Sequence, residues 1–167
     1  ENINYGSSKN LSDEEIIEAL KIAQAWDFVQ KLPEDLNEKV SQGGKNFSGG
    51  QKQRLSIARA IASKAPILIF DDSFSALDYK TDAKLRAELA VKTKSQTKFI
   101  VAQRVTSIMQ ADKIIVLDGG KIVGIGTYGE LLKNNEIYRE IASSQLSDEE
   151  IEKLLKEKHR DLPMIEI

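Results

Sequence analysis

Cysteine is absent from the 167 residues, and histidine occurs once, at His159. Without cysteine there are no disulfide bonds, no thiolate metal sites and no cysteine nucleophile. A single histidine argues against a Ser-His-Asp triad and against a histidine-rich metal centre.

Long apolar runs and an excess of either charge are also missing. The longest apolar stretches, 65–70 and 114–117, are far shorter than the about 20 residues that span a bilayer. Residues 1–5 show no secretory signal, so any role at a membrane is expected to involve another domain or chain. Lys and Arg number 24 and Asp and Glu 26, a balance that does not favour nucleic acid as a partner.

The sequence that is present predicts an α/β protein. Hydrophobic residues make up 41% and charged residues 30%, as expected of a soluble globular chain. Capping boxes that begin at Ser12, Thr127 and Ser147 predict helix starts, the last opening an amphipathic helix over 148–158 that could dock on its own domain or on a partner. Two further helices are expected over 51–64 and 80–92.

Short apolar runs predict the strands. Residues 67–70 and 98–102 are expected in a parallel sheet, the first of them buried on both faces. A third strand over 113–117 should turn at 118–121 into a hairpin strand over 122–125. Strands alternating with helices after a helical opening indicate a parallel sheet with an appended helical subdomain.

A glycine-containing turn at the start of a predicted helix is the first candidate site. Ser48 offers a hydroxyl, Gly49 and Gly50 allow close approach of a ligand to the backbone, and Gln51 lies in the first helical turn. Unpaired N–H groups there could bind a phosphate. The alternative is that Ser48 is an ordinary N-cap and the glycines form an ordinary turn.

Carboxylates directly after a buried strand form the second candidate site. Asp71 could hold Mg²⁺ through its water shell, and Asp72 could orient or activate a water molecule. Asp78 follows in Ser-Ala-Leu-Asp over 75–78. The alternatives are a polar loop for the first pair and a helix cap for Asp78.

The order and spacing of these pieces resemble the nucleotide-binding domain of ATP-binding cassette (ABC) transporters. The resemblance runs through Phe-Ser-Gly-Gly-Gln-Lys-Gln-Arg over 47–54, Ile-Leu-Ile-Phe-Asp-Asp over 67–72 and Ser-Ala-Leu-Asp over 75–78, which look like the family's signature motif, Walker B strand and D-loop. It covers about 1–146, and residues 1–6 resemble the exporter stretch after the Q-loop.

The resemblance implies a partial P-loop NTPase (RecA-like) core. The Walker A pattern G-x-x-x-x-G-K-[ST] does not occur in the chain, so its loop and the first strands are expected to be missing. We expect a helical signature subdomain over 1–64, the C-terminal half of the ATPase core over 65–146 and a helical tail over 147–167. By itself such a fragment should expose apolar sheet surface and should not hydrolyse ATP.

Two positions depart from the family pattern. Asp72 stands where active members carry a glutamate general base, and its side chain reaches about 1.5 Å less far. Gln103 stands where a switch histidine is expected, and glutamine cannot carry a proton or a charge. Together these changes resemble the degenerate half of a heterodimeric exporter; the alternatives are a slower homodimeric ATPase and an altered sequence.

The resemblance also implies cofactors and partners. ATP and Mg²⁺ would bind between two domains, with Ser48, Gly49, Gly50 and Gln51 completing the partner's site and Asp71, Asp72, Asp78 and Gln103 lying on this chain's side. The partners would be a second nucleotide-binding domain, from a different subunit, and the coupling helices of a transmembrane domain at the cytoplasmic membrane face. The rival hypotheses are a DNA-repair or chromosome-type ABC ATPase and a non-catalytic interaction fragment.

Overall fold

The chain consists of two compact units, Glu1–Val101 and Ala102–Ile167. The computed structural model describes residues 2–7 and 10–160, without the side chains of 157–160. Residues 161–167 of the predicted tail and the side chain of His159 therefore lie outside the described residues. Each unit is described by itself, and the functional division into 1–64, 65–146 and 147–167 stays a prediction.

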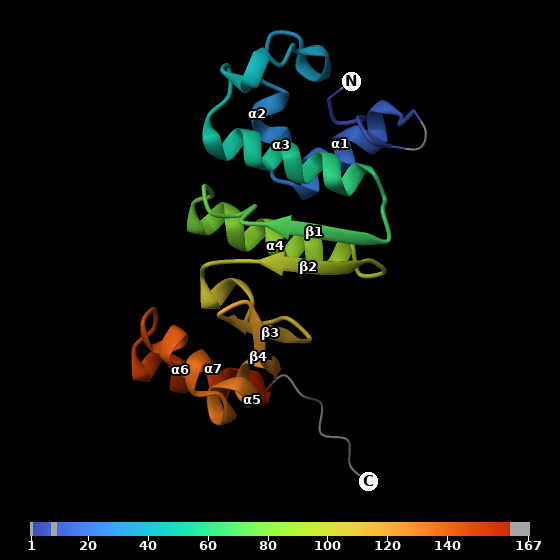
Figure 1. The fold of residues 1–167 in the computed structure, drawn as a ribbon. Coiled ribbons are helices and arrows are strands. Elements are labelled where there is room, and N and C mark those ends of the chain that lie inside the picture. The colour runs from blue at the N-terminus through green and yellow to red at the C-terminus, as the bar shows by residue number, and fades with distance from the viewer. Residues whose placement is uncertain (1, 8–9, 161–167) are drawn as a thin grey trace. The chain divides into compact units, whose positions relative to one another are not determined.

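The first unit is built mainly of helices together with one pair of strands (Figure 1). Ser12 caps α1 in the predicted capping box, because its side chain accepts from Glu15 N and the Glu15 side chain accepts from Ser12 N. The elements are α1 (Asp13–Ile22), α2 (Trp26–Val29), η1 (Asp35–Asn37), η2 (Gln42–Gly44), α3 (Gly49–Ala62), β1 (Ile67–Asp71), α4 (Tyr79–Lys92) and β2 (Thr97–Val101).

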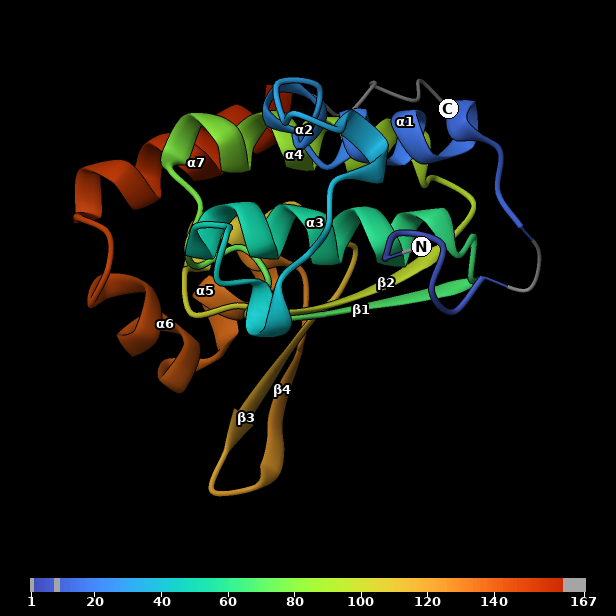
Figure 2. The same ribbon diagram turned by 90° about the horizontal axis from the view of Figure 1, so that it is seen from above.

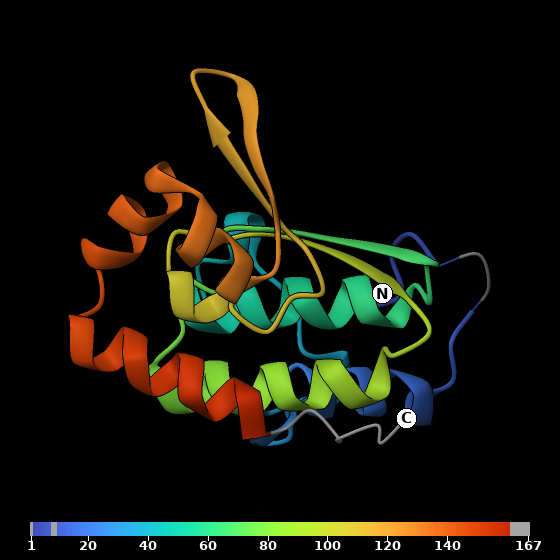
Figure 3. The ribbon, with the colours of Figure 1, turned by 90° about the horizontal axis from the view of Figure 1, so that it is seen from below.

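Strands β1 and β2 are parallel, as predicted, with a register that runs from Ile67 opposite Thr97 to Asp71 opposite Val101. Figures 2 and 3 show α1, α3 and α4 on the same side of this pair. Burial alternates along β1, so the prediction that it is buried on both faces was wrong for this chain. Leu68 and Phe70 join the core.

The opposite face of β1 and β2 carries apolar side chains in the open. Ile67 and Ile69 of β1 are 53% and 69% exposed, and Phe99 and Val101 of β2 are 52% and 58% exposed. In the described residues of this unit, no further element packs on these side chains. Four neighbouring exposed side chains of this kind form a surface that a second layer would normally cover.

The second unit packs helices on an antiparallel hairpin. Its elements are η3 (Val105–Ser107), β3 (Ile114–Asp118), β4 (Lys121–Gly126), α5 (Tyr128–Asn134), α6 (Glu136–Ser143) and α7 (Asp148–Arg160). The predicted turn is present, with Gly119 and Gly120 at φ 52° and 76°, where glycine carries no steric penalty. The hairpin forms its own sheet, separate from β1 and β2.

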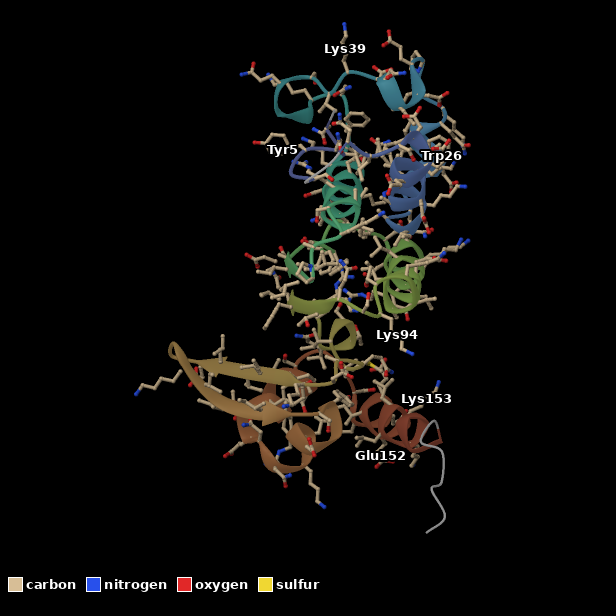
Figure 4. All side chains as sticks on the ribbon, turned by 90° about the vertical axis from the view of Figure 1, so that its right-hand side faces the viewer. Tyr5, Trp26, Lys39, Lys94, Glu152 and Lys153 are labelled. Carbon is tan, nitrogen blue, oxygen red and sulfur yellow. The ribbon has the colours of Figure 1, made fainter. Side chains whose placement is uncertain are left out.

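Helix α7 docks on its own unit, which decides between the two possibilities that the sequence left open. Ile151, Leu154 and Leu155 are half-buried against the core that contains Val105, Tyr128 and Tyr138. On its outer face Glu152 and Lys153 are exposed, and both are labelled in Figure 4. Within the described residues, no helix is both long enough and apolar enough to cross a membrane.

Candidate functional site

The turn at Ser48 is closed by its own side chains. Ser48 Oγ accepts from Gln51 N at 3.3 Å, and Gln51 Oε1 accepts from Ser48 N at 2.8 Å. This reciprocal pair is a capping box, and it starts α3 at Gly49, two positions earlier than the sequence predicted. Ser48 is therefore an N-cap, as one of the two predictions for it stated.

The two glycines of this turn have different surroundings. A Cβ added at Gly50 would lie 3.0 Å from the carbonyl oxygen of Ala76, whereas one added at Gly49 would meet only the Ala76 Cβ, at 4.0 Å. Gly50 thus permits the close approach of α3 to the chain after β1. Among the described residues the N–H groups of Gly49 and Gly50 have no hydrogen-bond acceptor, as is usual in a first helical turn.

The two carboxylates sit where β1 ends. Asp71 is the last residue of the strand, and both side chains are exposed. Asp72 has φ 46°, a left-handed conformation that aspartate tolerates better than most residues other than glycine. Its N–H donates to the Val101 carbonyl at 3.1 Å, which extends the pairing with β2 by one bond.

Gln53 holds the chain after these carboxylates, a role that the sequence did not reveal. Its Nε2 donates to the Asp72 carbonyl at 3.3 Å and to Ser75 Oγ at 3.2 Å, and its Oε1 accepts from Ala76 N at 3.0 Å. One side chain on α3 therefore fixes both ends of the segment 72–76. The only sequence feature that could have indicated this role was a glutamine near the start of a helix that follows a glycine turn.

Asp78 caps α4, as the simpler of the two predictions for it stated. Its Oδ1 accepts from Thr81 N at 3.0 Å, and its Oδ2 accepts from Thr81 Oγ1 at 2.7 Å. These hydrogen bonds lower the pKa of Asp78 below the ordinary 3.8, and the bond from the Thr81 hydroxyl makes the largest contribution. The carboxylate is thus ionised and already engaged in the free chain.

Arg54 connects the same helix to the helical region before it. Its Nη1 donates to the Gln24 carbonyl at 2.8 Å, its Nε donates to the Gly50 carbonyl at 3.3 Å, and its guanidinium lies 4.9 Å from the centre of the Phe28 ring. Burial lowers the pKa of Arg54, and the charges of Asp78 and Asp27 oppose that shift. Arg54 thus places a positive charge next to the carbonyl of Gly50, within the glycine turn.

Gln103 belongs to the second unit and is exposed. Its carbonyl accepts from Gln145 Nε2 at 2.9 Å, and Gln145 Oε1 accepts from Val105 N at 2.9 Å. The structure brings Ser48, Gly49, Gly50, Gln51, Asp71, Asp72 and Asp78 into one unit and places Gln103 in the other. Gln145 was not singled out from the sequence.

A helix N-terminus with free N–H groups and carboxylates at the carboxyl end of a parallel strand, both in one unit, are typical of α/β nucleotide-binding domains. Residues 3–75 match the family model described as ABC transporter. Together with relatives that are 43% and 47% identical over 87% of the chain, this match shows that the chain belongs to the nucleotide-binding domains of ABC transporters.

The relatives include a flippase and an ABC transporter ATP-binding protein. The chain is 43% identical over 145 residues to an ATP-dependent lipid A-core flippase of Francisella tularensis, covering 87% of this chain and 24% of the flippase. It is 47% identical over 147 residues to an uncharacterized ABC transporter ATP-binding protein of Mycobacterium bovis, covering 87% of this chain and 25% of that protein.

A solved structure shares the fold as well. The chain superposes on a bacterial Atm1-family ABC exporter with ATP bound at a TM-score of 0.81 and 34% identity, covering 86% of this chain and 25% of the exporter. The chain thus spans about a quarter of the length of the curated relatives that it matches.

Proposed function

We propose that the chain is the C-terminal part of the ATP-binding subunit of an ABC exporter, in which ATP binding and hydrolysis between two head-to-tail domains power export. The proposal rests foremost on one observation: the serine-glycine-glycine-glutamine turn opens a 14-residue helix and leaves the N–H groups of Gly49 and Gly50 free. The exporter relatives support the same function.

The glycine turn fits a terminal phosphate supplied by the opposite domain. Free N–H groups at the positive end of a helix bind anions, and Gly49 leaves the approach open because no heavy atom comes nearer than 4.0 Å to an added Cβ. The Ser48 hydroxyl accepts from Gln51 N and keeps its own proton to donate. In this proposal Ser48, Gly49, Gly50 and Gln51 complete the partner's ATP site.

The carboxylates fit a Mg²⁺ ion that keeps most of its waters. Asp71 is an exposed carboxylate at the end of β1, and among the described residues no group of three or more histidine or acidic side chains could enclose a metal ion. Mg²⁺ in nucleotide sites is usually held by one or two carboxylates and the phosphates. Asp71 would hold the ion through water when ATP supplies the other ligands.

Asp72 and Gln103 are proposed to make this chain's own site a poor catalyst. Asp72 would act as a shortened general base, and Gln103 would contact the terminal phosphate as a hydrogen-bonding group without charge. The working site of the dimer would then be the partner's, a different subunit that receives its signature from this chain. Asp78, engaged by Thr81, would hold the D-loop at the interface.

The open apolar surfaces support the view that more sequence completes the domain. The exposed face of β1 and β2 matches what the missing strands and Walker A segment of a P-loop core would cover. The helical region up to Gln42, with Lys39 in the connection before η2 (Figure 4), would contact the coupling helices of a transmembrane domain. The protein would then work at the cytoplasmic face of the cell membrane, without nucleic acid.

ATP turnover of the full-length subunit, alone and with candidate partner subunits, tests this function. We expect a low rate for the subunit alone and a higher rate in the pair, which Ser48→Ala lowers because the signature acts in trans. Asp72→Glu with Gln103→His should raise turnover of the subunit's own site. Full turnover by the unmodified subunit alone would instead indicate a homodimer and contradict the degenerate-site proposal.

A further inference from the structure

Gln145, which lies between α6 and α7, contacts the segment that follows β2. Its side-chain amide donates to the Gln103 carbonyl and accepts from Val105 N, each at 2.9 Å. The partners lie 42 and 40 residues away in the sequence. One amide thus bridges the backbone on both sides of Arg104 and satisfies a donor and an acceptor at once.

The position of Gln145 is itself fixed by two helices. It follows the end of α6, where Gln145 N and Leu146 N both donate to the Ala142 carbonyl, at 3.0 and 2.9 Å. Two residues later Ser147 caps α7: its Oγ accepts from Glu150 N at 3.3 Å, and Glu150 Oε2 accepts from Ser147 N at 2.9 Å. Leu146 is half-buried against the core of the unit.

The segment that Gln145 holds has few other constraints before Val105. Gln103 and Arg104 are exposed, whereas Val105 is buried and begins η3. Side chain to backbone bonds contribute modestly one at a time, but two bonds from one rigid amide also restrict orientation. Without them the carbonyl of Gln103 and the N–H of Val105 would turn to water.

We propose that Gln145 is a positioning residue for the segment 103–105, and that α6 and α7 act through it on the side chain of Gln103. The effect on nucleotide rests on the proposed function, in which the side chain of Gln103 contacts the terminal phosphate of ATP. The hydrogen bonds of Gln145 to the segment 103–105 do not depend on that function. A change at the junction of α6 and α7 would then alter the response of residue 103 to nucleotide.

Hydrogen exchange in the full-length polypeptide tests the contact without nucleotide. In Gln145→Ala we expect the peptide that contains Val105 to exchange about fivefold faster, the loss expected for one hydrogen bond. In Gln145→Glu a carboxylate can still accept from Val105 N, but it loses the donor to the Gln103 carbonyl and brings two oxygens together, so exchange there should lie between that of Gln145→Ala and that of the original protein. Ser144→Ala is the matched control, because Ser144 Oγ donates only to the nearby Ile141 carbonyl.

A general loss of stability would look different. If Gln145 merely stabilised the unit, Gln145→Ala would speed exchange equally in β3 and α5, and Gln145→Glu would not restore protection. Either result, or unchanged exchange at Val105 in Gln145→Ala, would overturn the proposal.

The same measurement with ATP and Mg²⁺ tests the consequence. Residues 103–105 should gain protection on ATP addition, and Gln145→Ala should raise the half-saturating ATP concentration for that protection about fivefold while Ser144→Ala leaves it unchanged. An equal midpoint in Gln145→Ala would overturn the proposed action on Gln103. Absence of any ATP effect in the original protein would refute the proposed function, and the nucleotide-free experiment would still decide the contact.

Discussion

Two turns of the first unit are held in different ways. The turn at Ser48 is closed by Ser48 and Gln51, which bond to each other's backbone three residues apart. The turn after β1 is held from outside, since Gln53 bonds to Asp72, Ser75 and Ala76 from 19 to 23 residues away. The first turn can therefore form with α3 alone, whereas the second needs α3 already in place.

The turn after β1 is therefore coupled to α3. The close packing of Gly50, where an added Cβ would lie 3.0 Å from the Ala76 carbonyl oxygen, and the bonds of Gln53 both join α3 to residues 72–76. A displacement of the α3 N-terminus, where we propose the partner's phosphate binds, would move residues 72–76 with it. Because the same contacts act in both directions, a displacement of residues 72–76 would also act on the α3 N-terminus, although the capping box itself does not involve these residues.

The largest expected effect is that of Gln53→Ala. It removes three hydrogen bonds to the turn after β1 and should lower the free energy of unfolding by about 2 kcal/mol. Gln51→Ala, which removes one bond from the capping box, should cost about 0.5–1 kcal/mol. Urea unfolding followed by circular dichroism measures both, and equal losses would show that the two turns are not held differently.

Replacing each of the two glycines with alanine should separate the effect of packing on stability from the effect of helix propensity. Gly50→Ala places a Cβ 3.0 Å from a backbone oxygen and should destabilise the protein by about 1–2 kcal/mol. Gly49→Ala meets nothing nearer than 4.0 Å and should be neutral or stabilising by about 0.5 kcal/mol. Thermal unfolding of the pair is the measurement; a stabilising Gly50→Ala would mean that residue 76 moves aside freely.

Replacing the cap itself should cost less. Ser48→Ala removes the acceptor for Gln51 N and should destabilise α3 by about 1 kcal/mol, whereas Ser48→Thr should retain most of the capping energy. Hydrogen exchange at Gln51 gives the local readout. If exchange changed equally in residues 72–76, the two turns would be one cooperative unit and the distinction between them would fail.

The smallest effect concerns pH, because only the second turn ends in a titrating cap. The folded pKa of Asp78 is lowered, so its contribution to stability is fully present above the unfolded value near 3.8 and is lost as pH falls through the lower folded value. As the pH is lowered through that range, the urea concentration at the unfolding midpoint of the original protein should decrease. Asp78→Asn keeps a capping oxygen and should flatten this part of the profile; an unchanged slope would assign the acid sensitivity to other groups.

Features that depend on neighbours in sequence could be predicted, and features that depend on distant contacts could not. The capping boxes at Ser12 and Thr127 and the turn at Gly119 and Gly120 follow from residues at most three apart, and all are present. Gln53 and Gln145 were missed because glutamine has many uses and their bonding partners lie far along the chain.

The exposure of β1 was mispredicted for a related reason. An apolar strand indicates that both faces can be buried, but it does not state what covers each face. Leu68 and Phe70 have their partners within the described residues of the first unit, whereas Ile67 and Ile69 do not. The candidate site residues, in contrast, could be identified from the order of the motifs alone.

The left-handed backbone at Asp72 also bears on how such a sequence diverges. At φ 46° aspartate is among the residue types that fit best, so a mutation from glutamate to aspartate relaxes the main chain while it shortens the general base. The return mutation would restore reach and reintroduce backbone strain. If residue 72 is the general base that we propose, loss of catalysis at this position would be an easier evolutionary step than its recovery, and a lineage that divides labour between two subunits would tend to keep that division.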